Sequence, residues 1–162
     1  MNNDRLNFRA WNKVTLTDEE DNDYEKSFIL YNVDAFKGHI AGIHEENFED
    51  QLKKQGFSED EIEQIKQGYS IEYYDGDYLN IDVEEIDQCT GLKDTNGKLI
   101  YEGDVIFING EKWCVIWENE DCAFFFSNLK EVYRQPIFPD FYMMVDDFEV
   151  IGNIHENPEL LK

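Results

Sequence analysis

Short apolar runs separated by turn residues predict most of the elements of this chain. Apolar and polar side chains alternate over residues 6–11, which predicts a short strand. Residues 28–31 form a continuous apolar run, which predicts a buried strand. Between them, residues 18–25 hold six acids in eight positions, and we expect this run to form a solvated loop. The pattern over residues 34–44 is ambiguous.

Two amphipathic helices are predicted next. Residues 45–55 place two apolar side chains four positions apart, and Gly56 follows as a C-terminal cap. Residues 58–61, with the sequence Ser-Glu-Asp-Glu, form a capping box at the start of a second helix that ends near Gly68. Both helices have narrow apolar stripes and acidic outer faces. We therefore expect them to lie on the surface of another element and not to form a core of their own.

Tight turns and short strands dominate the rest of the chain. An Asp-Gly pair at 75–76 and Asn-Gly pairs at 96–97 and 109–110 each separate two strand-like runs and predict hairpins. Three further apolar runs, at 122–126, 142–145 and 148–154, also predict strands. With the hairpin strands after residue 90, they make about five strands in this half of the chain. Short strands at this spacing predict a small barrel.

The charge of the chain narrows the classes of partner. Its 162 residues include 37 acids and 14 bases, for a net charge of −23. Residues 1–89 carry 23 acids and 8 bases, whereas residues 90–162 carry 14 and 6. With 41% hydrophobic and 15% aromatic residues, the chain can bury a core, so the acids lie on the surface of a folded protein. Such a surface repels nucleic acid and anionic membranes and favours a basic protein partner, although acidity that serves only solubility is the alternative.

Cysteine usage and the apolar runs indicate a cytoplasmic protein. The three cysteines, Cys89, Cys114 and Cys122, have no paired spacing, which argues for a reducing compartment. We expect Cys114, in the middle of a predicted strand, to be a core residue. The N-terminus has no apolar stretch, and the longest apolar runs are five residues, so neither a signal peptide nor a membrane span is predicted.

No constellation in the sequence indicates catalysis, a metal or a cofactor. His39 and His44 are five positions apart and His155 is remote, which does not favour a zinc site. The chain has no phosphate-binding loop, no Gly-x-Ser-x-Gly and no convincing Cys–His pair. With 37 acids, paired carboxylates arise by chance and carry no weight. We therefore expect a protein that is not an enzyme and that needs no cofactor.

Three sequence boxes resemble one protein family. Residues 90–105 read TGLKDTNGKLIYEGDV, and residues 150–161 read VIGNIHENPELL. Residues 8–13 read FRAWNK, where the family usually has Asp in place of Asn12. In this order the boxes resemble the YopX-like family of phage and prophage proteins. The resemblance covers the opening residues and most of 85–162, whereas residues 18–84 match no box of the family that we recognise and look particular to this protein.

The resemblance implies a phage or mobile-element origin and an α+β fold that contains an SH3-like barrel, without an established activity. We expect a C-terminal SH3-like small β-barrel in residues 85–162. Residues 1–84 should add an N-terminal strand, two surface helices and an acidic hairpin, in a separate region or in one compact domain with the barrel. Structural roles account for the family boxes: turns or bulges for Gly91, Gly97, Gly103 and Gly152, core positions for Leu92, Ile100, Val105, Ile151 and Ile154, and anchoring of the first strand for Arg9 and Trp11.

Two functional hypotheses remain. In the first, ordered carboxylates imitate a nucleic acid and bind a basic host protein that handles nucleic acid or takes part in defence. The candidate residues lie on the two helices and the 75–76 hairpin: Glu45, Glu46, Glu49, Asp50, Glu59, Asp60, Glu61, Glu63, Glu72, Asp75, Asp77, Asp82, Glu84, Glu85 and Asp87. In the second, an accessory or regulatory phage protein binds another protein through its barrel and through exposed aromatics such as Phe138 or Tyr142, and the acids serve only solubility. A homo-oligomer is compatible with either hypothesis.

Overall fold

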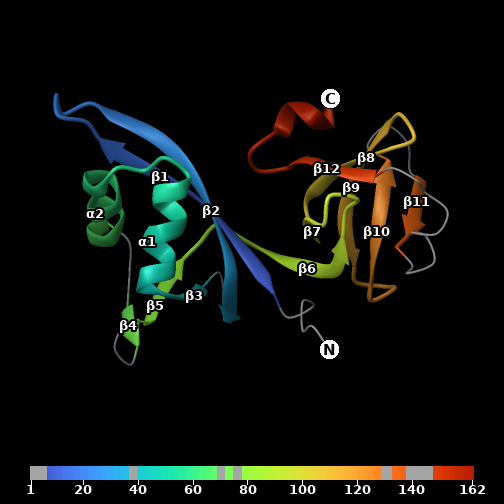
Figure 1. Ribbon diagram of the computed structural model, residues 1–162, viewed down its shortest axis with the longest axis horizontal. Coiled ribbons are helices and arrows are strands. Elements are labelled where there is room, and N and C mark those ends of the chain that lie inside the picture. Colours follow the sequence, from blue (N-terminus) through green and yellow to red (C-terminus); the bar gives the residue numbers. More distant parts are fainter. Residues whose placement is uncertain (1–6, 37–39, 69–71, 75–77, 129–132, 138–147) are drawn as a thin grey trace. The chain divides into compact units, whose positions relative to one another are not determined.

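The computed structural model describes residues 7–36, 40–68, 72–74, 78–128, 133–137 and 148–162 (Figure 1). Its contacts divide the chain into two compact units. The N-terminal unit comprises Asn7–Asp87, and the C-terminal unit takes in the described residues from Gln88 onward. Strand β6 (Glu85–Lys93) begins in the first unit and continues into the second. The division predicted from the sequence, between residues 84 and 85, stays a prediction.

A curved sheet forms the framework of the N-terminal unit. Its strands belong to a seven-stranded sheet of order β4-β5-β3-β2-β1-β6-β7, with β7 formed by Leu99–Tyr101. Strands β1 and β2 are consecutive and adjacent, so they form a long hairpin. The β1–β2 pairing runs antiparallel from Phe8 opposite Val33 to Thr17 opposite Asp23. The strands that precede β6 in the sequence are β1 (Phe8–Thr17), β2 (Asp23–Phe36), β3 (Ile40–His44), β4 (Glu72–Tyr74) and β5 (Tyr78–Asp82).

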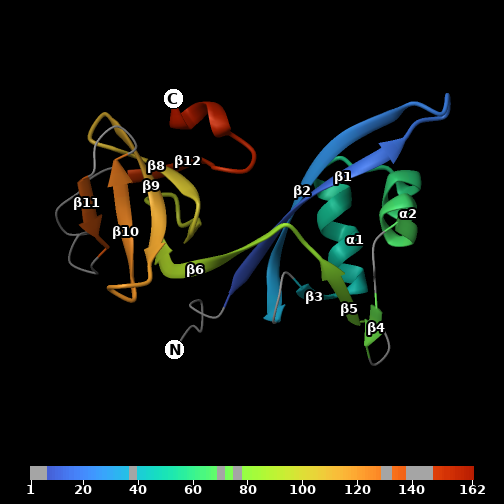
Figure 2. The same ribbon diagram turned by 180° about the vertical axis from the view of Figure 1, so that it is seen from behind.

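Two helices cover one side of this sheet. Helices α1 (Glu45–Lys54) and α2 (Glu59–Gly68) lie on the same side of the β1–β2 hairpin in both views (Figures 1 and 2). Their buried side chains, Phe48 and Leu52 from α1 and Ile62 and Ile65 from α2, join one core with strand residues such as Phe28. The prediction of two helices lying on another element is therefore confirmed.

The α1–α2 connection follows the predicted cap. Gly56 has a φ of +84°, a left-handed conformation that a side chain would strain. Its N–H donates to the carbonyl of Lys53, and the N–H of Phe57 donates to that of Leu52. Phe57 then packs edge-on against Phe28, with 6.1 Å between ring centroids. The cap therefore turns the chain so that α2 returns to the same core.

Two expectations for this unit need correction or stay open. The solvated loop is confined to residues 18–22, because Asp23, Tyr24 and Glu25 already belong to β2. The ambiguous stretch forms the end of β2 and then β3. Strands β4 and β5 pair antiparallel as the predicted hairpin requires, with Tyr74 opposite Tyr78, whereas Asp75 and Gly76 lie outside the described residues.

The C-terminal unit consists of short strands around a second core. A five-stranded sheet has the order β11-β10-β9-β8-β12, whereas β7 pairs with β6 at the end of the seven-stranded sheet. The predicted strand at 142–145 lies outside the described residues. The core contains Ile100, Ile106, Ile108, Val115, Phe126, Phe148 and Val150. The elements are β7 (Leu99–Tyr101), β8 (Asp104–Ile108), β9 (Glu111–Glu118), β10 (Ala123–Asn128), β11 (Tyr133–Pro136), β12 (Phe148–Asn153) and a 3₁₀ turn, Pro158–Leu161.

A predicted turn and several residues of the family boxes have local structural roles. Asn109 and Gly110 have φ values of +50° and +88°, as the predicted tight hairpin between β8 and β9 requires. Gly152 lies beside a register shift of β12, where a Cβ atom would be 2.4 Å from Asn157 Oδ1. The core prediction holds for Ile100 but is wrong for Ile151, which is 38% exposed because it faces outward at this bulge. In the described residues the fold is mostly β with two helices, in agreement with an α+β class.

Candidate acidic interface

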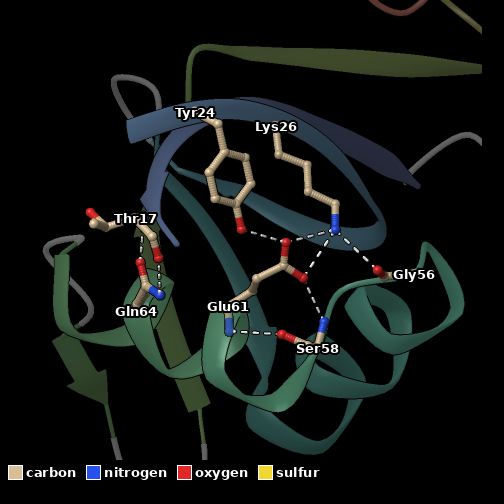
Figure 3. Close-up of polar contacts among 7 residues, drawn as sticks. All are labelled: Thr17, Tyr24, Lys26, Gly56, Ser58, Glu61 and Gln64. Carbon is tan, nitrogen blue, oxygen red and sulfur yellow. Dashed lines mark hydrogen bonds and ion pairs between the residues drawn. The ribbon is translucent and has the colours of Figure 1, made fainter. Parts of the chain in front are cut away.

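The capping box at the start of α2 is the first part of the candidate site. The N–H of Ser58 donates to Glu61 Oε2 at 2.6 Å, and the N–H of Glu61 donates to Ser58 Oγ at 3.2 Å. These reciprocal bonds satisfy two donors that the first turn of a helix otherwise leaves open. The predicted box is therefore confirmed, and it directs the Glu61 carboxylate back toward the sheet (Figure 3).

That carboxylate joins α2 to β2. Lys26 Nζ lies 2.9 and 3.0 Å from the two oxygens of Glu61, and the hydroxyl of Tyr24 donates to Oε1 at 2.9 Å (Figure 3). Lys26 also donates to the carbonyl of Gly56 and sits 3.9 Å from the centroid of the Phe57 ring. The ammonium group is thus held by a carboxylate, a carbonyl and an aromatic face at once.

The protonation equilibria follow from these contacts. Burial by itself raises the pKa of Glu61, but the Ser58 N–H, Lys26 and Tyr24 together outweigh it and hold this pKa below the ordinary value of 4.5. The hydrogen bond to Glu61 raises the pKa of Tyr24 above its ordinary value. Glu61 is therefore an anion with its partners in place at neutral pH.

The tip of the β1–β2 hairpin is attached to the same helix. The N–H of Thr17 donates to Gln64 Oε1 at 2.9 Å, and Gln64 Nε2 donates to the carbonyl of Thr17 at 3.0 Å (Figure 3). A side-chain amide that bonds both backbone groups of one residue fixes the end of β1 against α2. The acidic loop therefore lies beside the acidic first turn of the helix.

Within the loop, one carboxylate organises the backbone. Asp18 Oδ1 accepts hydrogen bonds from the N–H groups of Glu20 and Asn22, each at 2.9 Å. The Asn22 backbone bond is the main cause that lowers the pKa of Asp18 below its ordinary value. Asp21 adopts a left-handed φ of +62°, and Asp18 to Asp23 are all exposed. The loop is an ordered turn that presents acids to solvent.

The loop and α2 border a shallow hollow of about 580 Å³. Four acids are among its lining residues: Asp18, Glu19, Asp60 and Glu61. We call the acids of the loop, of the adjoining start of β2 and of the first half of α2 the acidic interface: Asp18, Glu19, Glu20, Asp21, Asp23, Glu59, Asp60, Glu61 and Glu63. The loop was missing from the candidate residues, although its run of six acids in eight positions was the available signal.

The acids predicted on α1 are placed differently. Lys66 of α2 donates to Glu45 Oε1 at 2.6 Å and also to Glu49, so two α1 carboxylates face an ammonium group. Those carboxylates outweigh the effect of burial and raise the pKa of Lys66 above its ordinary range. Asp50 pairs with Lys54 one turn later, and Glu46 is exposed. The α1 face is a set of carboxylate–ammonium pairs and not a bare row of anions.

The α2 acids are more open to solvent. Glu59, Asp60 and Glu63 are exposed, and Glu63 accepts a hydrogen bond from Gln67 in its own helix at 2.8 Å. Glu61 is half-buried, with its side chain 14% exposed. Three of the four candidate acids on this helix are therefore available to a partner.

The candidate acids near the hairpin divide further. Glu72 belongs to β4, and Asp75 and Asp77 lie outside the described residues. Asp82, Glu84 and Glu85 are exposed around the β5–β6 connection. Their position between β5 and β6 does not bring them next to the α2 acids, because this connection contacts a different part of β1.

Strand β1 separates these two groups of acids. Asn12 Nδ2 donates to the carbonyl of Asp82, and the N–H of Glu84 donates to that of Trp11, whereas Gln64 is bonded to Thr17. At about 3.3 Å per residue, the six positions between Trp11 and Thr17 correspond to roughly 20 Å. The candidate residues therefore do not form one continuous surface.

One predicted acid is not at the surface at all. Asp87 accepts a hydrogen bond from Arg9 Nε at 2.7 Å, and the two side chains are only 7% and 2% exposed. This pair joins β1 to β6, because a buried carboxylate requires a partner of opposite charge. The assignment of Asp87 to an acidic hairpin face is wrong, whereas the predicted anchoring role of Arg9 agrees with the pair.

Metal and membrane features are few in the described part of the chain. His44 is exposed just before α1, and His39 lies outside the described residues. No group of three His, Cys, Asp or Glu side chains in the described ranges is arranged to hold a metal ion. Neither described helix is long and apolar enough to cross a membrane.

Comparison with known proteins identifies one family. The family model described as "YopX protein" matches residues 7–162. The expectation that residues 18–84 fall outside the family pattern is therefore wrong, because the match runs through the acidic loop and both helices. No curated protein matches the chain. Among solved structures, protein EF1440 from Enterococcus faecalis is 21% identical, covers 95% of this chain and 98% of its own, and superposes with a TM-score of 0.45.

Proposed function

The chain belongs to the YopX protein family, and for this member we propose the function of a non-enzymatic interaction protein that binds a basic protein through the acidic interface. In this role its carboxylates take the place of nucleic-acid phosphates on a protein that handles nucleic acid or acts in host defence. The main observation in support is that hydrogen bonds between Thr17 and Gln64 attach the acidic loop to α2. The ion pair of Glu61 with Lys26 joins the same helix to β2.

Charge and order both support this role. Residues 7–87 contain 22 acids and 7 bases, a net charge of −15. B-form DNA presents one charge about every 1.7 Å of its axis, so a competitor for its binding groove needs a dense set of anions. Anions held by an ordered loop and helix lose less conformational freedom on binding than anions on a disordered tail. The loop and α2 meet both requirements better than α1, where Glu45, Glu49 and Asp50 are paired with lysines.

The proposal includes a setting and a scaffold. The protein is a phage or prophage product that acts in the cytoplasm of a host bacterium, in line with the sequence boxes described above. The proposed scaffold is an SH3-like barrel of strands β6 to β12, and the core that Ile100, Ile106 and Phe126 share supports it. That barrel serves as the scaffold, and the acidic interface carries the specificity.

Two triple variants test the proposal at equal net charge. Glu19→Gln, Glu20→Gln and Asp60→Asn remove three exposed acids from the acidic interface. A control variant removes three exposed acids of the C-terminal unit: Glu111→Gln, Glu149→Gln and Glu159→Gln. Both variants and the wild-type protein are immobilised, and nucleic-acid-binding proteins are captured from a host lysate at low and high salt, with and without competing duplex DNA.

The proposal expects capture that falls steeply with salt, is displaced by DNA and is lost in the interface variant alone. If both variants lose capture equally, the effect is due to overall charge and not to the acidic interface. If the interface variant still captures these proteins, the proposal is contradicted. Circular dichroism and thermal unfolding confirm that each variant is folded.

A second function, contact through the C-terminal unit, is favoured by one observation. Trp117 and Phe124 form an edge-to-face pair with 4.9 Å between centroids, and both rings are half-buried beside a hollow. In this second function the acids serve only solubility. It expects binding that resists salt and is lost when the aromatic rings are removed.

A further inference from the structure

Three strands of the C-terminal unit surround an aromatic hollow. It has a volume of about 320 Å³ and lies between β6, β9 and β10. Leu92, Trp117, Phe124 and Ile137 supply its apolar lining. This volume is at the lower end of ligand pockets, so it suits one or two side chains of a peptide better than a large ligand.

The Trp117 ring is held in a defined orientation. Its Nε1–H donates to Asn119 Oδ1 at 3.1 Å, and its ring meets that of Phe124 at an interplanar angle of 69°. Because the ring is anchored on one edge and packed on another, little rotamer freedom remains for a ligand to remove. A tryptophan face is also the best aromatic surface for a cationic group.

Acids lie in the chain between two residues that line the hollow, Trp117 and Cys122. The turn that joins β9 to β10 begins after Glu118 and carries Glu120 and Asp121, both exposed. Residues 118–121 thus contribute three acids and no base. Cys122, at the end of this turn, is exposed and lines the hollow itself. An apolar aromatic hollow flanked by an acidic turn is complementary to a long side chain that has an aliphatic stem and a positive end.

We propose that this hollow binds an arginine or lysine side chain presented by a basic segment of a partner protein. The stem of the side chain packs against Leu92 and Ile137, and its charged end lies over the aromatic pair and close to Glu120 and Asp121. The proposal concerns the same unit as the second function but differs from it, because it assigns Glu120 and Asp121 a part in binding and therefore predicts a salt-dependent contribution. It does not rest on the acidic interface, which belongs to the N-terminal unit.

The exposed thiol provides a local assay. Among the three cysteines, Cys122 is exposed, whereas Cys89 and Cys114 are buried. The rate at which a disulfide reagent labels Cys122 in the full chain therefore reports occupancy of the hollow. The probes are five-residue peptides, alike except for a central arginine, lysine, citrulline or leucine. Citrulline keeps the shape of arginine and lacks its charge. The indole N–H resonance of Trp117 provides a second readout.

The proposal expects the arginine and lysine peptides to slow labelling of Cys122 and to shift the Trp117 resonance. Citrulline should bind at least about two- to fivefold more weakly, as the loss of an exposed cation–π contact implies. Glu120→Gln with Asp121→Asn should weaken the arginine peptide and reduce its salt dependence, because both side chains are exposed at a turn and outside the core.

Matched variants separate this site from the acidic interface. Glu19→Gln, Glu20→Gln and Asp60→Asn should leave the protection of Cys122 unchanged, and loss of protection in that variant would assign the peptide to general charge attraction. Equal affinity for arginine and citrulline peptides would overturn cation recognition. Protection that grows with protein concentration in the absence of peptide would assign the hollow to a second copy of the chain, and would also overturn the proposal.

Discussion

Substitution of Glu61 by glutamine tests the framework of the acidic interface. Glu61→Gln keeps the size of the side chain but removes the charge that faces Lys26 and accepts from Ser58 and Tyr24. A hydrogen bond to a charged group contributes about 1.5–3 kcal/mol when buried, and an exposed ion pair only about 0–1 kcal/mol. The side chains of Glu61 and Lys26 are 14% and 28% exposed, so their interaction lies between the buried and the exposed case.

The expected loss of stability is therefore about 1–2 kcal/mol. It stays below the cost of a fully orphaned buried charge, because Lys26 keeps the carbonyl of Gly56 and the ring of Phe57. Urea unfolding followed by circular dichroism at 222 nm measures it. Both described helices belong to the N-terminal unit, so the helical signal follows that unit even when the other unfolds separately. Glu63→Gln, an exposed neighbour with the same change in charge, is the control and should stay within about 0.5 kcal/mol.

The pH dependence gives the sign of the effect. Because the folded pKa of Glu61 is depressed, its stabilisation is present above the ordinary value of 4.5 and is lost as pH falls through the folded pKa. The stability difference between wild type and Glu61→Gln should therefore shrink between neutral pH and acid. If Glu61→Gln is no less stable than Glu63→Gln at pH 7, or if the difference is unchanged in acid, the reasoning is refuted.

Three further substitutions test other parts of the fold. Gly152→Ala should destabilise the C-terminal unit by about 1–3 kcal/mol in tryptophan-monitored unfolding, because the new Cβ would lie 2.4 Å from Asn157 Oδ1. Gly110→Ala should lower the free energy of unfolding by about 1 kcal/mol in the same assay. The cause is the φ of +88° alone, since no atom lies within 4 Å of the added Cβ. Arg9→Met leaves Asp87 buried without the ion pair that it forms with Arg9, so it should lower the free energy of unfolding of the N-terminal unit, measured through the helical signal, by about 3–5 kcal/mol. Arg9→Met combined with Asp87→Leu should recover part of that loss.

Local signals were sufficient for several features of the fold. The capping box of Ser58 and Glu61, the left-handed Gly56 and the Asn109–Gly110 turn depend on residues within a few positions of one another. Their geometry follows from backbone conformation and short hydrogen bonds, which a sequence pattern encodes directly. The two helices and their buried stripes were predictable for the same reason.

The acidic run shows where a local pattern misleads. Acids disfavour a strand on average, yet Asp23 and Glu25 lie in β2 opposite Thr17 and Thr15. Lys13 on the neighbouring strand forms an ion pair with Glu25, and the exposed face of the sheet keeps these carboxylates in water. Cross-strand pairing therefore outweighs the preference of the individual residues.

The candidate site depended on contacts that the sequence does not reveal. Arg9 and Asp87 are 78 positions apart, and Thr17 and Gln64 are 47 apart. Lys66, which takes Glu45 and Glu49 out of the acidic surface, comes from the other helix. Acids that look alike in the sequence thus become a buried ion pair, a helix clamp or an open interface according to the distant residues beside them.

Measurement of DNA-competed capture by the interface variant tests the central claim most directly. Wild type, the variant with Glu19→Gln, Glu20→Gln and Asp60→Asn, and the control lacking three acids of the C-terminal unit are compared at one salt concentration. The account predicts that wild type and control retain nucleic-acid-binding proteins that duplex DNA displaces, and that the interface variant retains none. Equal retention by all three proteins, or capture that DNA does not displace, would contradict it.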